Sequence, residues 1–250
     1  MDKFDFNGKK VLVTGASSGV GREVAILLSK MGAKVVIVAR RESELNKTLS
    51  LMEGNIHSYR VLDLADFDKV VETVKELVSV DGQKFDCIAH CAGIAIPIPL
   101  RSISMANITQ IFSANTYSFM ALLKCAAQKK IFNDNGAVVG ISSCVGVYGQ
   151  AANAVYGASK GAMDALMKSA AKELRPRKIR VNTICPCGIK TEMLANQAVK
   201  DIDGDEIESL PDYLMLPEKV ATVVVALLSD SMQYISGVAI DVDEAKTWEE

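Results

Sequence analysis

The chain has 250 residues, of which 49% are hydrophobic and 23% charged, and its formal net charge at pH 7 is -2. This is an ordinary globular composition at a length that suits one large α/β domain, so fibrous and disordered classes are excluded. The slightly acidic balance offers no basic field to a polyphosphate backbone, and nucleic acid is not expected as a partner.

The sequence predicts neither secretion nor a membrane span. Residues 1–8 lack the apolar core of a signal peptide, and no run of about 18 uncharged apolar residues occurs. The six cysteines form no Cys-x-x-Cys pair and mostly lie in apolar stretches, which favours reduced, buried thiols over a metal cluster. We therefore expect a cytoplasmic protein without a metal site.

Short apolar runs alternate with segments of helical periodicity along the chain. The β-branched run at 10–14 is typical of a buried strand, and the next apolar residues recur at helical spacing until Gly32. The expected strands are 10–14, 33–39, 57–62, 85–90, 137–142, 179–185 and 238–242. The expected helices are 22–31, 42–52, 66–78, 104–130 with a break near Asn115, 154–174 and 217–228.

This alternation predicts parallel strands joined by right-handed crossovers. Because the strands are continuously apolar, helices should cover both faces of the sheet. The fold expected for residues 1–250 is a single α/β domain with a doubly wound, or Rossmann, parallel sheet of about seven strands. The segment 192–216 shows no clear element.

Three glycines, Gly15, Gly19 and Gly21, stand between the first expected strand and the first helix. Such a turn lets the backbone approach a pyrophosphate, while the helix presents free N–H groups and the positive end of its dipole. The spacing differs from the commoner Gly-x-Gly-x-x-Gly pattern. A tight turn between packed elements, without a ligand, remains the alternative.

The second expected strand ends in Arg40 and Arg41, and no carboxylate occurs there before Glu42. An acidic residue at this point would hold the ribose 2′-hydroxyl of NAD, whereas arginine accommodates the 2′-phosphate of NADP. The guanidinium offers a charged fork of donors that suits a phosphate. The pattern favours NADP(H), and the alternative is the solvated basic start of a helix.

Tyr156 and Lys160 lie four residues apart and therefore share one helical face. An ammonium near a phenol favours the phenolate and should bring the pKa of the phenol toward the working pH, which suits a general acid or base. Ser143 closes the preceding expected strand, where doubly wound folds bind ligands. Alone, the tyrosine–lysine pair could be coincidental, and Ser143 could be a cap.

In this order along the chain, the features resemble the short-chain dehydrogenase/reductase family, in its short, single-domain, NADP(H)-preferring branch. The resemblance runs from Lys9 to about Val242. The residues that carry it are Thr14, Gly15, Gly19, Gly21, Asp63, Leu64, Ala92, Gly93, Asn115, Ser143, Tyr156, Lys160 and the segment 186–191.

The resemblance implies a role for each matching residue. Ser143 would position a carbonyl, Tyr156 would give or take the proton, and Lys160 would bind the nicotinamide ribose and tune Tyr156. Asn115 would hold a water in a proton relay. The other residues implied in binding NADP(H) are Gly15, Ser17, Ser18, Gly19, Val20, Gly21, Arg40, Arg41, Asp63, Leu64, Cys91, Ala92, Gly93, Pro186, Ile189 and Thr191. Asp63 and Leu64 would border the adenine, and Ile189 and Thr191 the nicotinamide.

The chain departs from the family pattern at three places. His90 and Cys91 replace two asparagines, and we interpret His90 as a structural rather than a catalytic histidine. Cys187 replaces the glycine that usually follows Pro186, which would narrow the pocket near the nicotinamide. Residues 242–245 replace the usual Asp-Gly-Gly, which puts the family's contacts between subunits in doubt.

The segment 192–216 would form the family's substrate lid, although a solvated acidic surface is an alternative. Its acidic residues at 201–208 disfavour a strongly anionic substrate and weaken assignment to a 3-oxoacyl thioester on an acidic carrier protein. That substrate remains the leading specific hypothesis, because basic residues elsewhere in the chain would form a docking patch for the carrier protein. The residues of this patch would be Lys129, Lys130, Arg175, Arg177 and Lys178.

Small members of the family are usually homotetramers built on helices such as 104–130 and 154–174, so a tetramer or dimer is expected. The alanines that would allow close packing are Ala121, Ala126, Ala127, Ala162, Ala165, Ala170 and Ala171, although packing within one subunit would also explain them.

The sequence therefore predicts an oxidoreductase that interconverts a small-molecule carbonyl and a secondary alcohol. Other ketone, hydroxysteroid or sugar-type carbonyl reductases are alternatives to the 3-oxoacyl reductase. A non-catalytic NADP(H)-binding regulator on the same fold is a rival of another class. The glycine spacing and the short substrate segment argue against a nucleotide-sugar epimerase or dehydratase.

Overall fold

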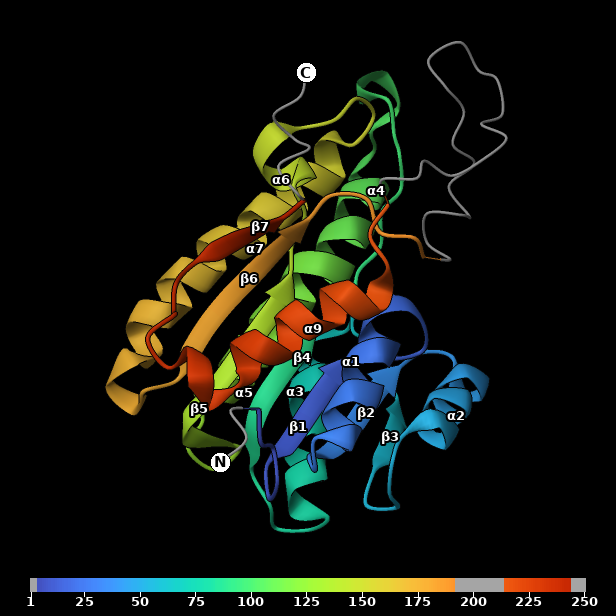
Figure 1. The fold of residues 1–250 in the computed structure, drawn as a ribbon. Helices are drawn as coiled ribbons and strands as arrows, with labels where there is room; N and C mark the ends of the chain where they lie inside the picture. The colour runs from blue at the N-terminus through green and yellow to red at the C-terminus, as the bar shows by residue number, and fades with distance from the viewer. Residues whose placement is uncertain (1–3, 192–213, 244–250) are drawn as a thin grey trace.

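The computed structural model describes residues 4–191 and 214–243, which form one seven-stranded parallel sheet between two layers of helices (Figure 1). The strand order is β3-β2-β1-β4-β5-β6-β7. The strands are β1 (Lys10–Thr14), β2 (Lys34–Ala39), β3 (Ser58–Val61), β4 (Phe85–His90), β5 (Phe132–Ile141), β6 (Arg180–Pro186) and β7 (Ala239–Val242). The predicted doubly wound sheet of seven strands is confirmed.

Helices cover both faces of this sheet. One layer contains α1 (Gly19–Lys30), α2 (Glu42–Leu51) and α9 (Pro217–Leu228), and α1 packs against α9. The other contains α3 (Phe67–Ser79), α5 (Ser118–Ala126) and α7 (Ala154–Leu174). The helix α4 (Met105–Phe112) precedes α5, and the short α6 (Val145–Tyr148) lies against α7. Single 3₁₀ turns occur at Leu100–Ser102, Arg175–Arg177 and Asp230–Met232.

The apolar runs become central strands because both of their faces are buried. Along β1, Leu12 packs into the core on the α3 and α5 side, while Val11 and Val13 pack into the core beneath α1 and α9. Residues that alternate along a strand point to opposite faces, so an uninterrupted apolar run fills both cores. At the edge of the sheet β3 is largely exposed.

The helices and strands lie close to the predicted segments, with four differences, one of which is that α5 ends at Ala126 and not at the expected residue 130. Helix α1 begins at Gly19 instead of residue 22, because the last two glycines of the turn already belong to the helix. Strand β5 begins at Phe132, before the expected residue 137, and α6 was not expected. The break near Asn115 is a π-helical turn, η2 (Ser113–Tyr117), between α4 and α5. In the described part of the chain, no helix is long and apolar enough to cross a membrane.

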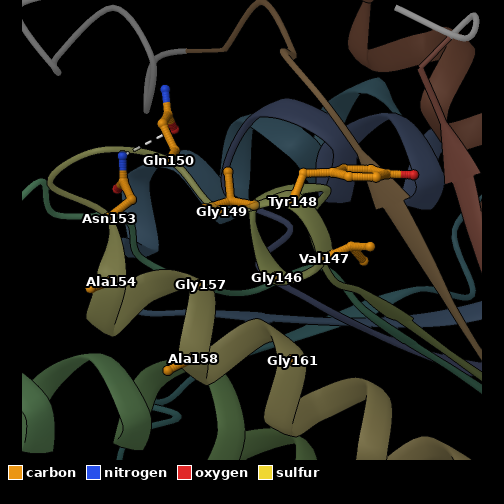
Figure 2. A pocket seen from close by; sticks show the side chains of 11 residues that line it. Gly146, Val147, Tyr148, Gly149, Gln150, Asn153, Ala154, Gly157, Ala158 and Gly161 are labelled. Carbon is orange, nitrogen blue, oxygen red and sulfur yellow. Dashed lines mark hydrogen bonds between the residues drawn. The ribbon is translucent and has the colours of Figure 1, made fainter. Parts of the chain in front are cut away.

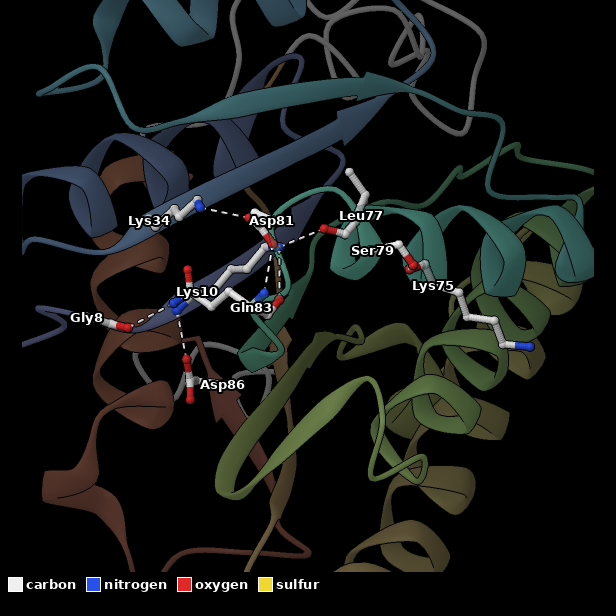
Figure 3. A network of polar contacts seen from close by, with 9 residues as sticks. All are labelled: Gly8, Lys10, Lys34, Lys75, Leu77, Ser79, Asp81, Gln83 and Asp86. Carbon is white, nitrogen blue, oxygen red and sulfur yellow. Dashed lines mark hydrogen bonds and ion pairs between the residues drawn. The ribbon is translucent and has the colours of Figure 1, made fainter.

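A buried lysine organises the amino-terminal edge of the sheet (Figure 3). The Lys10 side chain is 1% exposed, and its ammonium donates to the Leu77 and Gln83 carbonyls at 2.8 and 3.1 Å and to the Asp81 carboxylate at 2.7 Å. Lys34 reaches the same carboxylate at 2.7 Å. Because a buried charge is stable only when it is paired and hydrogen-bonded, this network fixes the end of α3 against β1.

Candidate active site

The predicted site residues gather mainly at the carboxyl edge of the sheet, opposite the Lys10 network. Parallel strands direct all their carboxyl ends to one edge, which is where open α/β sheets bind ligands. The glycine turn follows β1, residues 91–93 follow β4, Ser143 follows β5, and Pro186 ends β6. Segments that are distant in the sequence are thereby brought together.

Each glycine of the turn meets a different steric requirement. Gly15 has φ +68°, and a Cβ there would lie 2.6 Å from the backbone nitrogen of Ala92. A Cβ on Gly21 would overlap the carbonyl oxygen of Gly15. A Cβ on Gly19 would instead face the Cγ2 atom of Thr191 at 3.2 Å. Gly15 and Gly21 are therefore required by packing within the protein. Gly19 is favoured by its own backbone conformation, with φ +54°, and it also keeps the space between the turn and Thr191 open.

The amino terminus of α1 points out of this turn. Its cap residue Ser18 is extended and makes no side-chain cap hydrogen bond, and Val20 is buried in the first turn of the helix. Uncapped N–H groups and the positive end of the helix dipole form a site for an anion such as a phosphate.

Side chains of α2 bind the glycine turn and the start of α1, and the sequence carries no sign of these contacts. Arg22 pairs with Glu44 at 2.8 Å and also donates to the carbonyl of Ser17. The Thr48 hydroxyl donates to the carbonyl of Ala16 at 2.8 Å. These contacts fix the backbone of the turn, so its shape does not depend on a ligand.

Arg40 and Arg41 follow β2 beside the turn. Arg41 donates to the hydroxyls of Ser18 at 3.0 Å and Ser17 at 3.4 Å. Arg40 is exposed and makes no hydrogen bond or ion pair to another described residue. The segment that contains Asp63 and Leu64 lies next to this strand end, because the Leu62 amide donates to the Ala39 carbonyl at 2.9 Å. Asp63 is exposed and Leu64 is buried.

Ser143, Tyr156 and Lys160 come together where β5 ends against α7. The Lys160 ammonium lies 5.8 Å from the centroid of the Tyr156 ring and donates to the Ile141 carbonyl at 2.7 Å. The Ser143 side chain hydrogen-bonds to the Tyr156 phenol. A Cβ on Gly93 would lie 3.3 Å from the Lys160 ammonium, so Gly93 leaves the approach to this lysine open.

Burial dominates the protonation of these groups. It raises the pKa of Tyr156, although the hydrogen bond from Ser143 opposes the rise. Burial also lowers the pKa of Lys160 to about 8. We expected the ammonium to lower the pKa of the phenol, but the structure gives the opposite net direction, since desolvation disfavours the phenolate. In the protein alone, the phenol is therefore protonated at neutral pH.

Asn115 lies in the π-helical turn and is fully buried. Its side-chain oxygen accepts from the Ile94 amide at 2.8 Å, and its side-chain nitrogen donates to the Ile94 carbonyl and the Ser159 hydroxyl, both at 3.0 Å. Asn115 thus ties the segment after β4 to α7. Ser159 was not identified from the sequence as a site residue. Its position between Tyr156 and Lys160 could have indicated that it lies at the site. Single π-helical turns are frequent at functional sites.

His90 is a structural histidine, as the sequence suggested. It is fully buried, and its Nδ1 and Nε2 atoms lie 2.8 Å from the Thr14 hydroxyl and 3.2 Å from the Ser118 hydroxyl. Burial lowers the pKa of His90 to about 3, so the ring is neutral. A neutral ring that is hydrogen-bonded at both nitrogens and shielded from solvent is not available as a base for substrate.

The segment after β6 borders the same edge. The Cys144 amide donates to the Pro186 carbonyl at 3.2 Å, which continues the pairing of β5 with β6 beyond the strand ends. Ile189 pairs with Met215, and the Thr191 hydroxyl donates to the Ile189 carbonyl at 3.4 Å. Of the predicted lid at 192–216, residues 192–213 lie outside the described residues, as do residues 244 and 245 of the altered C-terminal pattern.

A cavity of about 470 Å³ between α6 and α7 is separate from this site (Figure 2). The α7 residues that line it include Ala154, Ala158 and Gly161, which share one face of the helix. At 3.6 residues per turn, Tyr156 points to a different side of α7. The cavity therefore does not contain the three catalytic candidates.

The predicted basic docking patch lies away from the site. Lys129 and Lys130 precede β5, and residues 175–178 precede β6, so both segments lie at the amino-terminal edge of the sheet. The Arg177 guanidinium is occupied, because it donates to Asp134 at 2.7 Å and to the carbonyls of Ala126 and Phe132. Within one subunit, these residues do not border Ser143 and Tyr156.

Comparison with known proteins identifies the family to which this chain is similar. A family model described as Enoyl-(Acyl carrier protein) reductase, a short-chain dehydrogenase/reductase model, matches residues 15–244. A 3-oxoacyl-[acyl-carrier-protein] reductase from Thermotoga maritima is 31% identical over 94% of this chain and 96% of its own. A short-chain dehydrogenase/reductase from Botryotinia fuckeliana is 32% identical over 97% of this chain and 98% of its own.

A solved structure from Brucella melitensis has a similar fold. It is described as a short-chain dehydrogenase/reductase of the glucose/ribitol dehydrogenase type. It superposes with a TM-score of 0.86 at 27% identity and covers 97% of this chain and 98% of its own. The similarity extends over the whole sheet and both helical layers.

Proposed function

Because this chain belongs to the short-chain dehydrogenase/reductase family and is an oxidoreductase, we propose that it uses NADP(H) to interconvert a ketone and a secondary alcohol. The observation that carries the proposal is the convergence of Ser143, Tyr156 and Lys160 at the sheet edge that also holds the glycine turn. A nicotinamide dinucleotide supplies the hydride for such a reaction.

The residues at this edge fit a dinucleotide. Gly19 keeps the turn open toward Thr191, and the first turn of α1 has no side-chain cap. We assign the pyrophosphate to this opening, between residues 15–21 and Thr191. Gly93 leaves room beside Lys160 for a ribose. The remaining binding residues in the proposal are Asp63, Leu64, Cys91, Ala92, Pro186 and Ile189.

Two arginines support NADP(H) over NAD(H). Arg40 is exposed beside the turn, and Arg41 is held against it by Ser17 and Ser18. A 2′-phosphate would receive charge-assisted hydrogen bonds from them. The variant Arg40→Ala should weaken NADPH binding about 10- to 100-fold, the size of a lost hydrogen bond to a charged group, and leave NADH binding nearly unchanged. Titration of the fluorescence of each cofactor measures this, and an equal effect on both contradicts the phosphate role.

The side chains have distinct roles in the proposed reaction. The Ser143 hydroxyl orients the substrate oxygen, and Tyr156 donates its proton to that oxygen as the alcohol forms. Lys160 binds the ribose, and Asn115 supports the delivery of a replacement proton from solvent. Because the pKa of Tyr156 is raised by burial, its phenol carries the proton that reduction needs.

The leading substrate in the proposal is a 3-oxoacyl thioester on an acyl-carrier protein. The support comes from the relatives that carry this activity in their names, such as the Thermotoga maritima protein. The basic patch lends no support within one subunit, since it lies at the opposite edge of the sheet. We keep residues 192–216 as the proposed lid of a single catalytic domain that spans residues 1–250.

Assembly and location are also part of the proposal. We propose a cytoplasmic homo-oligomer, a tetramer or dimer, that contacts neither nucleic acid nor membrane. Of the alanines predicted to serve subunit packing, Ala121, Ala126 and Ala171 are buried in the subunit's own core, whereas Ala165 is exposed on α7. Light scattering during gel filtration measures the mass, and a monomer at micromolar concentration contradicts the proposed assembly.

The decisive experiment follows NADPH absorbance against a panel of ketones that includes a short 3-oxoacyl thioester. Tyr156→Phe should bind NADPH nearly as tightly as the wild type while turnover falls by about 10² to 10⁴, the usual contribution of a general acid. Tyr148→Phe is the matched control, because its hydroxyl bonds Asp241 at 3.3 Å. Full activity of Tyr156→Phe would refute the mechanism. NADPH binding without turnover of any carbonyl would favour the regulator.

A further inference from the structure

A buried carboxylate lies beneath the catalytic candidates. Asp164 is one helical turn beyond Lys160 on the same face of α7, and it is 7% exposed. One carboxylate oxygen accepts from the Thr183 hydroxyl on β6 at 2.7 Å, and the other accepts from the Ser142 hydroxyl at 3.0 Å. Burial raises the pKa of Asp164, and the hydrogen bonds from the Thr183 and Ser142 hydroxyls, together with the charges of Lys160 and Lys168, oppose the rise and favour the charged form.

Ser142 connects Asp164 to Lys160 and to Ser143. The Ser142 hydroxyl also lies 3.2 Å from the Lys160 carbonyl, so it sits between two acceptors on α7. On its amino-terminal side, Ile141 supplies the carbonyl that holds the Lys160 ammonium. On its carboxyl-terminal side is Ser143. Asp164 thus anchors the three-residue strand end on which the positions of Lys160 and Ser143 depend.

The Asp164 carboxylate also interacts electrostatically with the Lys160 ammonium. Burial lowers the pKa of Lys160, and Asp164 makes the largest opposing contribution, ahead of Cys185 on β6 and Cys91 after β4. The other groups that face this lysine are Tyr156 on α7, Asn115 in the π-helical turn and the neutral His90 on β4. None of these is an anion at neutral pH.

We propose that Asp164 is a positioning residue of the active site, which supplies the buried counter-charge of Lys160 and fixes, through Ser142, the strand end that carries Ser143. This role rests on the proposed function, because Lys160 and Ser143 are the groups that the proposed reaction uses. In this proposal Asp164 acts through Lys160 and Ser142 and not on the reacting atoms.

The counter-charge is tested by Asp164→Asn in the full, cofactor-free protein. The amide has the same shape and can still hydrogen-bond Ser142 and Thr183, whose hydroxyls can turn to accept, but it lacks the charge. Labelling with ¹³C-lysine allows the ε-carbon resonance of Lys160 to be titrated, and Lys160→Arg assigns it. The midpoint should fall by about one pH unit, at the low end of the effect of a nearby opposite charge.

The matched control is Thr183→Val, which removes the other hydrogen bond of Asp164 and keeps its charge. The Lys160 midpoint of this variant should stay near that of the wild type. If Asp164→Asn does not fold, Asp164→Ser removes the same charge with a smaller side chain and should give the same shift. A Lys160 midpoint that Asp164→Asn or Asp164→Ser leaves unchanged overturns the counter-charge.

The anchoring role has a separate kinetic test. With an active ketone, Asp164→Asn should move the alkaline limb of the kcat–pH profile down by the same interval as the lysine midpoint. Ser142→Ala should lower kcat several-fold at a nearly constant KM, without moving that limb. A Ser142→Ala protein with wild-type kcat overturns the anchoring role. Since the lysine titration needs no turnover, a failure of the proposed reaction is distinguishable from a failure of the Asp164 proposal.

Discussion

The Lys10 network makes a quantitative prediction about stability. Lys10→Met keeps the apolar length of the side chain but removes an ammonium that bonds three groups and lies 4.7 Å from the centre of the Phe85 ring. The Leu77 and Gln83 carbonyls lose their charged donor, while Asp81 keeps Lys34 at 2.7 Å. Because α3 is held to β1 through this ammonium, the cost should appear in global unfolding.

The size of the stability loss in Lys10→Met depends on which partners of the ammonium are left without a hydrogen bond. Removing one partner of a buried ion pair costs about 3–5 kcal/mol when the other charge is left alone. Asp81 retains one cation and its side chain is 25% exposed, so we expect a loss of roughly 2–4 kcal/mol in the free energy of unfolding. At about 2–4 °C per kcal/mol for a protein of this size, the Tm should fall by roughly 5–15 °C.

Urea and thermal unfolding followed by circular dichroism measure this change. Lys34→Met is the matched control: its side chain is 29% exposed and pairs with the same carboxylate, so it should cost less than about 1 kcal/mol. Activity of folded Lys10→Met at low temperature should match the wild type, since the network lies at the edge of the sheet opposite Tyr156. Equal losses in both lysine variants would refute the argument that burial makes Lys10 the stronger contributor.

Two further predictions concern the glycine turn and acid stability. Gly21→Ala should lower the Tm strongly, because its Cβ meets the Gly15 carbonyl. Gly19→Ala, at φ +54°, should lower the Tm less and should also weaken dinucleotide binding; equal Tm losses would contradict this division. Burial acts to raise the pKa of Asp81, but hydrogen bonds from Lys10 and Lys34 hold it far below the ordinary 3.8. The charged Asp81 therefore stabilises the fold fully above pH 3.8, and this stabilisation is lost as the pH falls below that value. Lys10→Met should flatten the acid limb of a Tm–pH profile measured from pH 2 to 6.

The order of helices and strands was predictable because each segment carries a local signal. The apolar run of β1, the glycine at the end of α1 and the helical spacing of α7 depend on neighbours within a few residues. Once the strands are parallel, their carboxyl ends must share an edge, so the meeting of Gly15, Ser143 and Pro186 also followed from the sequence.

Contacts between distant residues were not predictable in this way. Lys10 looked like the ordinary polar start of a strand, and its burial depends on Asp81 and Gln83, which lie more than 70 residues away in the sequence. The brace of Arg22 by Glu44 likewise joins two helices whose separate patterns carry no sign of it. A local sequence pattern predicts a helix or strand. Whether a charged side chain is buried depends on distant residues that pack against it, so the local pattern does not predict it.

His90 shows how the structure changes the meaning of a sequence difference. In the sequence, His90 stands in place of an asparagine of the family pattern and is interpreted as structural, without any indication of its partners. In the structure the Ser118 hydroxyl donates to the Ala114 carbonyl at 2.7 Å, which leaves Nε2 of His90 as the donor toward Ser118 and Nδ1 as the acceptor from Thr14. One neutral ring therefore links the end of β1 to the helical segment that carries Asn115. The histidine links the two segments that frame the site, and its pKa of about 3, lowered by burial, keeps the ring neutral and these two hydrogen bonds unchanged at neutral pH.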